Sequence, residues 1–484
     1  MARLIVVSNR VAVPSQDGTG QAGGLAVAIR SLLERHPGIW FGWSGKVSSD
    51  GDSAARTIPR PGLSYVVMDL SEADYQEYYS GFANRVLWPI LHYRLDLAEF
   101  SRRELHGYRR VNAQFATRLH ELLRPDDIIW VHDYHLMPLA KMLRDRGHCN
   151  RIGFFLHVPF PPPEILTALP HHEWLIPTLS AYDLVGFQTQ SDAANFARYL
   201  GNECRQHKRG EYTFQTPERT VRIGVFPIGI ETAAFHQLAK RSVRSPLVRR
   251  VVQSLADRAM VIGVDRLDYS KGLPQRMDAF ERFLEVYTDW RGKMTYLQIT
   301  PKSRSQIQEY AQMERAIGAA AGRINGTYGE AAWTPIRYVN RAYSRTALAG
   351  LYRSARAALV TPLRDGMNLV AKEYIAAQDP ENPGVLILSR FAGAAAECTA
   401  ALLVNPYDPE AVATTIAQAL AMPLEERRER QDALFSVISK NDVHTWGELF
   451  LAALTGQVPQ PIQLQRPLLP STINPDFVLS GGAH

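Results

Sequence analysis

The organisation of this chain is clearest in residues 260–272, which read Met260-Val-Ile-Gly-Val-Asp-Arg-Leu-Asp-Tyr-Ser-Lys-Gly272. An apolar run typical of a buried strand leads into a polar loop, and a helical pattern follows from Pro274 to Tyr287. The same succession of strand, loop and helix recurs along the chain. It predicts an α/β protein in which parallel sheets are covered by helices on both faces.

Further strands are expected where short apolar or β-branched runs stop at polar residues, and helices where apolar residues recur at helical spacing. The strands predicted in this way are Leu4 to Ser8, Tyr65 to Leu70, Ile128 to His132, Ile152 to His157, Leu184 to Phe187, Val221 to Phe226, Met260 to Val264, Met294 to Ile299, Ile336 to Val339, Ala357 to Thr361 and Val385 to Ser389. The predicted helices include Leu25 to Arg35, Arg109 to Leu123, Pro274 to Tyr287, Ser344 to Arg353 and Asn368 to Gln378.

A change in composition predicts two doubly wound domains. Apolar strands give way near residues 231–249 to a basic, helix-like segment, and a new series of strands and helices begins at Met260. We expect an N-terminal domain over residues 1–236 and a C-terminal domain over residues 237–440. Residues 441–456 contain an apolar stripe at helical spacing, and the proline-rich residues 457–484 are expected to be a tail.

The composition excludes several classes of protein. The chain has 484 residues, of which 46% are hydrophobic and 21% charged, so it is long and apolar enough for two or three globular domains and is not disordered. The formal charge of +6 is a mild excess, which fits anionic small substrates better than nucleic acid. Three widely separated cysteines, no signal peptide and no membrane-spanning run predict a cytoplasmic protein without a membrane partner.

One glycine pattern has two interpretations. Gly18-Thr-Gly-Gln-Ala-Gly23 matches the GxGxxG sequence of dinucleotide-binding folds, but it begins ten residues after the strand that ends at Ser8, whereas that motif turns directly from strand into helix. A nicotinamide oxidoreductase is therefore an alternative that only this glycine pattern suggests. The loop ends in Gly23 and Gly24 at a helix start, where it either contacts a phosphate or is a plain flexible loop.

No metal or cofactor is predicted. Asp50-Gly-Asp52 has the form of a DxD metal site but lies in a Ser- and Gly-rich stretch away from any strand end. His132-Asp-Tyr-His135 and His171-His172-Glu173 lack a recognised ligand spacing with a third partner.

Two residues of the first half lie where parallel strands are expected to end. Asp133 follows Ile128 to His132, and its carboxylate either accepts hydrogen bonds from substrate hydroxyls or caps the helix from His135. His157 ends the next strand, and the proline-rich residues 158–163 hold its position.

Arginines at strand ends are candidates for phosphate recognition, because a guanidinium binds phosphate in a bidentate manner. Arg10 follows the first strand, and Arg304 follows the strand that ends at Ile299. Arg276 and Arg282 fall within a predicted helix, and we expect them on its solvated face.

The second half combines two such loops. Arg266 and Lys271 follow the strand that begins at Met260, and two cations there suit a diphosphate. After the strand from Ala357, an Asp-Gly turn containing Asp365 precedes a helix whose N-terminus can bind a phosphate, and Asp365 can hold sugar hydroxyls. A phosphate would repel Glu373, which is better placed to accept hydrogen bonds from ribose hydroxyls.

Taken together, the motifs closely resemble those of the trehalose-6-phosphate synthases, which are retaining glycosyltransferases of glycosyltransferase-B architecture. The resemblance runs from Ser8 to about Asp408, most of the chain. The motifs that carry it are Ala22-Gly-Gly-Leu25, Trp40-Phe-Gly-Trp-Ser-Gly-Lys46, Val86-Leu-Trp-Pro89, Trp130-Val-His-Asp-Tyr-His-Leu136, Arg266-Leu-Asp-Tyr-Ser-Lys-Gly272, Gly322-Arg-Ile-Asn-Gly326 and Thr361-Pro-Leu-Arg-Asp-Gly-Met-Asn-Leu-Val-Ala-Lys-Glu373.

The resemblance implies an activity and a set of roles. The family transfers glucose with retention from a nucleotide-glucose, usually UDP-glucose, to glucose 6-phosphate, giving α,α-trehalose 6-phosphate. By motif, the acceptor would be held by Arg10, Tyr79, Trp88, Asp133 and Arg304. The donor would be held by Gly23, Gly24, His157, Arg266, Lys271, Asp365 and Glu373, with His157 and Asp365 at the transferred glucose. Arg266, Lys271, His157 and Asp133 would be the catalytic residues.

The resemblance also implies a fold and a mechanism. Two Rossmann-like domains with a cleft between them are expected, with residues 441–456 as a helix that crosses back to the N-terminal domain; a core helix of the second domain is the alternative. No nucleophile and acid/base pair of carboxylates is evident, so metal-free front-face substitution is expected. Asp265 stands where many relatives have Glu, and no DxDxT phosphatase motif occurs.

Several questions stay open at this stage. Glycerol 3-phosphate is an alternative acceptor, and a catalytically silent sugar-phosphate sensor is an alternative function. The sequence does not choose between UDP, ADP and GDP in the donor, or between a monomer and a homo-oligomer.

Overall fold

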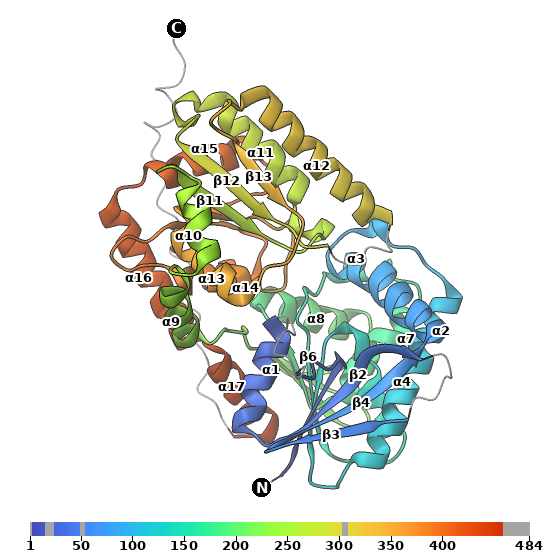
Figure 1. Cartoon of the computed structure of the whole chain (residues 1–484). Coiled ribbons are helices and arrows are strands. Elements are labelled where there is room, and N and C mark those ends of the chain that lie inside the picture. The colour runs from blue at the N-terminus through green and yellow to red at the C-terminus, as the bar shows by residue number, and fades with distance from the viewer. Residues whose placement is uncertain (1, 15–23, 49–53, 303–307, 458–484) are drawn as a thin grey trace. The chain divides into compact units, whose positions relative to one another are not determined.

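A computed structural model of the chain describes residues 2–14, 24–48, 54–302 and 308–457. Within these residues, the contacts divide the chain into two compact units, each built on its own sheet. The first unit contains the residues up to Gly229 together with those from Val443 on, and the second runs from Ile230 to Asp442. Figure 1 shows both units, with many of their helices and strands labelled.

The first unit is built on a sheet with the strand order β3-β4-β2-β1-β5-β6-β7-β10-β9-β8. Its strands are β1 (Leu4–Arg10), β2 (Gly38–Ser48), β3 (Arg56–Arg60), β4 (Leu63–Ser71), β5 (Ile128–His132), β6 (Arg151–Phe155), β7 (Leu184–Phe187), β8 (His207–Gly210), β9 (Thr213–Gln215) and β10 (Thr220–Val225). The strands from β4 to β10 pair in parallel, and the outer strands pair antiparallel. Central strands such as β1 are buried on both faces, which explains their continuous apolar sequences.

Helices connect these strands. The α-helices are α1 (Gly24–Arg35), α2 (Glu72–Asp74), α3 (Trp88–Leu91), α4 (Arg102–Leu122), α5 (Leu139–Arg144), α6 (Pro163–Leu166), α7 (His172–Leu175) and α8 (Gln190–Asn202). A π-helix, η1 (Tyr75–Leu87), joins α2 to α3, and the 3-10 helices are η2 (Leu95–Leu97), η3 (Tyr134–Leu136) and η4 (Ile176–Ala181). Local chemistry fixes their ends: the Thr189 hydroxyl, for example, accepts a hydrogen bond from the backbone N–H of Asp192 at the start of α8.

The last described helix, α17 (Val443–Thr455), packs in the first unit against α1, β6 and β7. Phe450 stacks on Trp130 with ring centroids 4.2 Å apart and an interplanar angle of 5°. Glycines in the sheet make room for this ring, because a Cβ added to Gly153 or Gly186 would lie 2.7 or 2.8 Å from it. The apolar stripe noted in the sequence is therefore the face with which α17 contacts the sheet.

The second unit is built on a fully parallel sheet with the order β13-β12-β11-β14-β15-β16. Its strands are β11 (Ala259–Val264), β12 (Met294–Ile299), β13 (Ile336–Val339), β14 (Ala357–Val360), β15 (Val385–Ser389) and β16 (Leu402–Val404). Numbered within the unit this is the order 3-2-1-4-5-6, which characterises doubly wound nucleotide-binding folds.

Two layers of helices cover this sheet. The helices are α9 (Thr232–Ser242), α10 (Pro246–Gln253), α11 (Leu273–Val286), α12 (Gln308–Tyr328), α13 (Arg345–Ser354), α14 (Leu369–Ala377), α15 (Pro409–Ala421) and α16 (Leu424–Lys440), with the 3-10 helices η5 (Tyr269–Lys271), η6 (Thr288–Trp290) and η7 (Gly393–Ala396). Helix α11 packs against α12 and α15, whereas α9, α13 and α14 pack against one another on the opposite side of the sheet (Figure 1).

The predicted α/β class, with two doubly wound parallel sheets, is confirmed. Every strand and helix expected from the sequence is present, although α4 begins at Arg102 instead of Arg109. The prediction missed β2 and several short strands, namely β3, β8, β9 and β16. Among the described residues, no helix is long and apolar enough to cross a membrane.

Candidate active site

The first unit has a topological switch point between β1 and β5. These strands are parallel neighbours, and β1 pairs with β2 on its other side, so the connections that leave them run in opposite directions. Ligands bind in open α/β sheets beyond the carboxyl ends of strands at such a point. Arg10 ends β1, while Asp133 and His157 follow β5 and β6. The three residues therefore lie at the carboxyl edge of one sheet, as the sequence indicated.

Arg10 is exposed at this edge. Its guanidinium carbon lies 5.9 Å from the centroid of the Trp43 ring, within the range of a cation–π contact. Gly45 lets the chain pass close to Arg10, because a Cβ there would lie 2.5 Å from Nε, and its φ of +87° is a conformation that glycine adopts readily. The aromatic ring and the glycine hold the stem of Arg10 while its charged group remains accessible.

Asp133 has an unusual backbone conformation, with φ of 75° and ψ of 164°. Non-glycine residues rarely adopt this conformation, and such strain costs about 1–3 kcal/mol and concentrates at functional sites. Its backbone N–H donates to the carbonyl of Phe155 at 2.8 Å, and its Oδ1 accepts from the backbone N–H of His157 at 3.3 Å. Its side chain does not cap the 3-10 helix that follows, so the capping alternative is wrong.

His157 is hydrogen-bonded to a second histidine. Nδ1 of His132 lies 3.0 Å from Nε2 of His157, and the two ring centroids are 5.3 Å apart. Burial lowers the pKa of His157 to about 3, and burial together with the nearby His157 holds the pKa of His132 well below its usual value. Both imidazoles are therefore neutral at pH 7, and His157 can give or accept a hydrogen bond without carrying charge.

Tyr79 lies on the π-helix η1, a rare conformation that is frequent at functional sites. Its ring is 5.6 Å from Tyr75, 5.5 Å from Trp43 and 5.9 Å from His135, with an interplanar angle of 13° to His135. Trp43 is also the ring against which Arg10 lies. This aromatic group connects Tyr79 to the end of β1, a connection that sequence reasoning missed because none of these rings is near Arg10 in sequence.

Ion pairs anchor the start of this helical segment to α4. Arg110 contacts both Asp74 at 2.6 Å and Glu77 at 2.9 Å, and Arg103 contacts Glu77 at 2.6 Å. The hydrogen bond from Arg103 holds the pKa of Glu77 below its ordinary value. These ion pairs therefore fix the carboxylates of Asp74 and Glu77, and with them the start of η1, on α4.

Trp88 begins α3, directly after η1, and is only 6% exposed. Its ring lies 4.1 Å from His92 and 5.8 Å from Tyr134, the residue after Asp133. Trp88 is thus packed near the strand-end loop with little free surface of its own.

The second unit has its own switch point between β11 and β14, which are parallel neighbours. The loop after β11 contains Arg266, which is exposed, and Lys271, which ends η5. The loop after β14 contains Asp365 and leads into α14. The four donor-binding candidates of this half, including Glu373 on α14, therefore come from the two segments that follow the switch-point strands.

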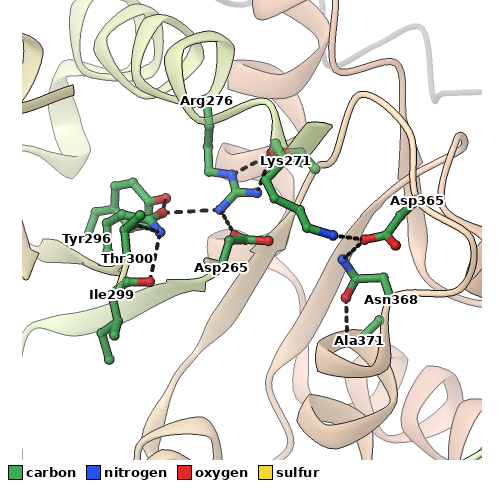
Figure 2. Close-up of polar contacts among 11 residues, drawn as sticks. Asp265, Lys271, Arg276, Tyr296, Ile299, Thr300, Asp365, Asn368 and Ala371 are labelled. Carbon is green, nitrogen blue, oxygen red and sulfur yellow. Dashed lines mark hydrogen bonds and ion pairs between the residues drawn. The ribbon is translucent and has the colours of Figure 1, made fainter. Parts of the chain in front are cut away.

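The two loops are joined by an ion pair, shown in Figure 2. The amino group of Lys271 contacts a carboxylate oxygen of Asp365, and the two side chains are 12% and 15% exposed. Asn368 donates to the same oxygen of Asp365 at 3.1 Å. Its own side-chain oxygen accepts from the backbone N–H of Ala371 at 3.3 Å and so caps α14. A cation and a helix N-terminus thus come together at the end of the sheet.

Arg276 corrects the sequence prediction that it lies on a solvated face. Its side chain is fully buried, and it pairs with Asp265 at 2.5 Å. It also donates to the Thr361 hydroxyl at 2.9 Å. A further hydrogen bond runs to the backbone carbonyl of Lys271 at 3.2 Å (Figure 2). Burial raises the pKa of Asp265 although the charge of Arg276 opposes this. Arg276 therefore supports both switch-point loops from beneath, whereas Arg282 is partly exposed as expected.

Glu373 lies on the first turns of α14 and is partly exposed. Burial raises the pKa of Glu373 to about 7, with the charge of Arg345 acting in the opposite direction. On the same helix Lys372 is fully buried in an ion pair with Glu397 at 2.6 Å, which fixes the helix within the unit. Glu373 is therefore held in place and changes charge near neutral pH.

Some of the candidates lie outside the described residues. These are Arg304, Gly23 with the rest of the GxGxxG segment, and Asp50-Gly-Asp52. Gly24 is described and begins α1. Among the described residues there is no group of three or more His, Cys, Asp and Glu side chains placed to hold a metal ion.

Comparison with known proteins gives a consistent result. The model of glycosyltransferase family 20 matches residues 2–456. A trehalose-6-phosphate synthase of Sinorhizobium fredii is 54% identical over 457 residues, which cover 94% of this chain and 98% of that protein.

Solved structures are equally similar. A UDP-forming α,α-trehalose-phosphate synthase from Burkholderia xenovorans, solved in complex with glucose-6-phosphate, has a TM-score of 0.91 and 47% identity, covering 94% of this chain and 100% of that one. A protein from Escherichia coli bound with UDP-2-fluoro glucose has a TM-score of 0.89 and 48% identity, covering 95% and 100%. These likenesses confirm the expected glycosyltransferase-B type of fold.

Proposed function

The chain belongs to glycosyltransferase family 20, and from this premise we propose that it transfers glucose from UDP-glucose to glucose 6-phosphate, forming α,α-trehalose 6-phosphate. The similar Burkholderia structure holds glucose-6-phosphate, and the similar Escherichia coli structure holds a fluorinated UDP-glucose. One observation carries the proposal: at the switch point of the second unit, Lys271 meets Asp365 at the N-terminus of α14. That combination of charge and backbone donors suits the diphosphate and sugar of a nucleotide-glucose.

The first unit is proposed as the acceptor-binding domain. Arg10 has an accessible guanidinium for the phosphate of glucose 6-phosphate, and we assign Arg304 to the same phosphate. The carboxylate of Asp133, fixed by its strained backbone, would accept hydrogen bonds from sugar hydroxyls. Tyr79 supplies aromatic surface of the kind that binds sugar faces, and Trp88 is assigned to the same sugar from its packed position beside Tyr134. Helix α17 belongs to this domain.

The second unit is proposed as the donor-binding domain. Arg266 and Lys271 would hold the diphosphate, and Glu373 would accept hydrogen bonds from the ribose hydroxyls. Asp365 and His157 are assigned to the transferred glucose, and Gly23 and Gly24 to the donor phosphates. Lys271 pairs with Asp365, so diphosphate binding would draw its amino group away from that carboxylate.

The proposed reaction is metal-independent and retains the configuration of the donor carbon. The bond from that carbon to the diphosphate oxygen breaks, and a bond to the acceptor hydroxyl forms on the same face of the sugar. The electron pair of the broken bond stays on the departing phosphate oxygen, so negative charge develops on the nucleoside diphosphate, and the hydroxyl proton passes to that same oxygen. Arg266, Lys271 and the helix dipole of α14 would stabilise that charge.

Product analysis tests this function. Purified enzyme is incubated with UDP-, ADP- or GDP-glucose and with glucose 6-phosphate or glycerol 3-phosphate, with and without a chelator, and the product is identified by NMR. We expect α,α-trehalose 6-phosphate, fastest from UDP-glucose and unaffected by the chelator. Failure to turn over glucose 6-phosphate with every nucleotide-glucose would refute the proposal.

Because phosphorylated sugars do not cross membranes unaided, this substrate pair supports a cytoplasmic location.

The diphosphate role is tested separately by Lys271→Ala. Removing a preorganised donor to developing charge lowers kcat by roughly 10²–10³-fold. Lys293→Ala, an exposed lysine of the same unit, is the matched control and should leave the rate unchanged. If Lys271→Ala retained the control's rate with an intact fold, the assigned role would be wrong.

A further inference from the structure

His132 and His157 form a hydrogen-bonded pair at the carboxyl ends of β5 and β6. His132 is the last residue of β5 and is completely buried, whereas His157 is partly exposed. Their single polar link is the 3.0 Å contact between Nδ1 of His132 and Nε2 of His157. Because both rings are neutral, one nitrogen of this contact donates and the other accepts.

The surroundings of the pair are aromatic. The His132 ring centroid is 4.8 Å from Trp130 and 6.1 Å from Trp446, and that of His157 is 4.7 Å from Phe155 and 6.0 Å from Trp446. Within the described part of the chain, Nε2 of His132 is buried without a hydrogen-bond partner. A buried polar atom without a partner is rare and costs free energy, so it needs an explanation, and a role of Nδ1 in holding His157 would provide one.

Among the residues that the structure describes, His157 has no other hydrogen bond that could orient its ring. Its backbone N–H contacts Asp133, but this bond leaves the side chain free to rotate. Among the described residues, no group is hydrogen-bonded to its second ring nitrogen, Nδ1. The contact with His132 therefore selects which edge of the His157 ring is available to a ligand.

We propose that His132 is a positioning residue that occupies Nε2 of His157 and so makes Nδ1 the nitrogen that meets the transferred glucose. This inference depends on the proposed function, which places His157 at that sugar. The hydrogen bond holds the ring in one orientation and one tautomer before the donor binds. His157 can then reach a sugar hydroxyl without first losing side-chain freedom.

A double-mutant cycle tests whether His132 acts through His157. His132→Phe keeps a ring of similar volume and removes both nitrogens, and we expect it to lower kcat/KM for the donor roughly tenfold, the value of one hydrogen bond. In a His157→Ala background the same substitution should change kcat/KM less than twofold. Equal losses in both backgrounds, or no loss in either, would overturn the proposal.

Two further comparisons keep the test independent of packing. An asparagine amide falls near the Nδ1 position of a histidine, and a glutamine amide near Nε2. His132→Asn should therefore recover much of the activity that His132→Phe loses, and His157→Asn should be more active than His157→Gln. The reverse order at His157 would refute the assignment of Nδ1. His172→Phe, on α7 and bonded to Tyr199, is the control for loss of a ring hydrogen bond elsewhere in the unit.

A spectroscopic measurement separates this inference from the proposed function. Nitrogen-15 NMR of the histidine rings, recorded on the full chain without substrate and assigned with His157→Gln, should show one tautomer for His157. In His132→Phe, His157 should lose its preference for one tautomer. In His132→Asn, Nε2 of His157 should remain hydrogen-bonded. A wild-type enzyme that makes no product refutes the function, whereas a His157 signal insensitive to His132→Phe refutes the positioning role.

Discussion

Replacing Arg276 by methionine should strongly destabilise the second unit. Arg276 and Asp265 are 0% and 2% exposed, so methionine would fill the space of the arginine but leave the carboxylate of Asp265 buried without its partner. Breaking a buried pair in this way costs about 3–5 kcal/mol. The substitution also removes the hydrogen bonds from the charged guanidinium to Thr361 and to the Lys271 carbonyl, and bonds of this kind are worth about 1.5–3 kcal/mol each.

The expected loss depends on pH in a defined direction. Burial already raises the pKa of Asp265, and removal of Arg276 removes a charge that lowers it. A carboxyl group whose pKa is higher in the folded than in the unfolded state takes up a proton on folding, so its unfavourable contribution shrinks as pH falls. The variant should therefore recover part of its lost stability between pH 8 and pH 5.

Thermal and urea unfolding of the full chain provide the assay. For a unit of this size a loss of 3–5 kcal/mol corresponds to a fall in the melting temperature of about 10 °C. Arg282→Met is a matched control, because Arg282 lies on the same helix and pairs with Glu285 and Glu410 at the surface. Such exposed pairs contribute about 0–1 kcal/mol.

The result that refutes this reasoning is specific. If Arg276→Met and Arg282→Met unfolded within about 1 kcal/mol of each other, Asp265 would not depend on its buried partner. A loss that grew as pH fell would contradict the sign of the linkage even if its size were correct. Asp265→Asn in combination with Arg276→Met should be more stable than Arg276→Met alone, because the buried charge is then absent.

Two further predictions concern the donor site and the docking of α17. Burial raises the pKa of Glu373 to about 7, and the ribose needs this residue as a carboxylate. The KM for the donor should therefore rise up to tenfold for each pH unit below 7, as the carboxylate is protonated. Glu373→Gln should abolish this pH dependence in initial-rate measurements. Gly186→Ala should lower the free energy of unfolding by about 1–3 kcal/mol, since its Cβ would lie 2.8 Å from Phe450. Gly201→Ala, in helix α8, should be neutral or stabilising in the same melting experiment, because its Cβ would lie 4.0 Å from the ring of Phe214, an ordinary contact distance.

The strands were predictable because burial on both faces leaves a simple signal. Strands such as β14 and β15 are continuous apolar runs bounded by polar residues, and the polar residues at their ends are also the candidate ligand groups. Strand β2 was missed because glycines and a lysine interrupt its aromatic sequence. The π-helix was missed because no sequence pattern distinguishes it from an α-helix.

Arg276 was misplaced for a different reason. Arginine in a helix is normally solvated, and its partner Asp265 is brought to it by the fold. A signal was nevertheless present: Arg276 falls on the same face of α11 as Leu273, Phe280 and Phe283, all of which are buried. A charged residue in the apolar stripe of a helix predicts a buried partner, and an acidic residue at a neighbouring strand end is the natural choice.

The two switch points differ in the chemistry that they offer. In the first unit, the neutral His132 and His157 pair, the fixed carboxylate of Asp133 and several aromatic rings suit hydroxyl groups and sugar faces. In the second unit, a lysine and a capped helix N-terminus suit a diphosphate. Asp133 and Asn368 both have φ of 75°, although neither is glycine; Asp133 directly follows β5, and Asn368 caps the N-terminus of α14. A backbone with so few alternatives fixes the direction of the side chain, so at both points the fold itself orients a polar group before any ligand arrives.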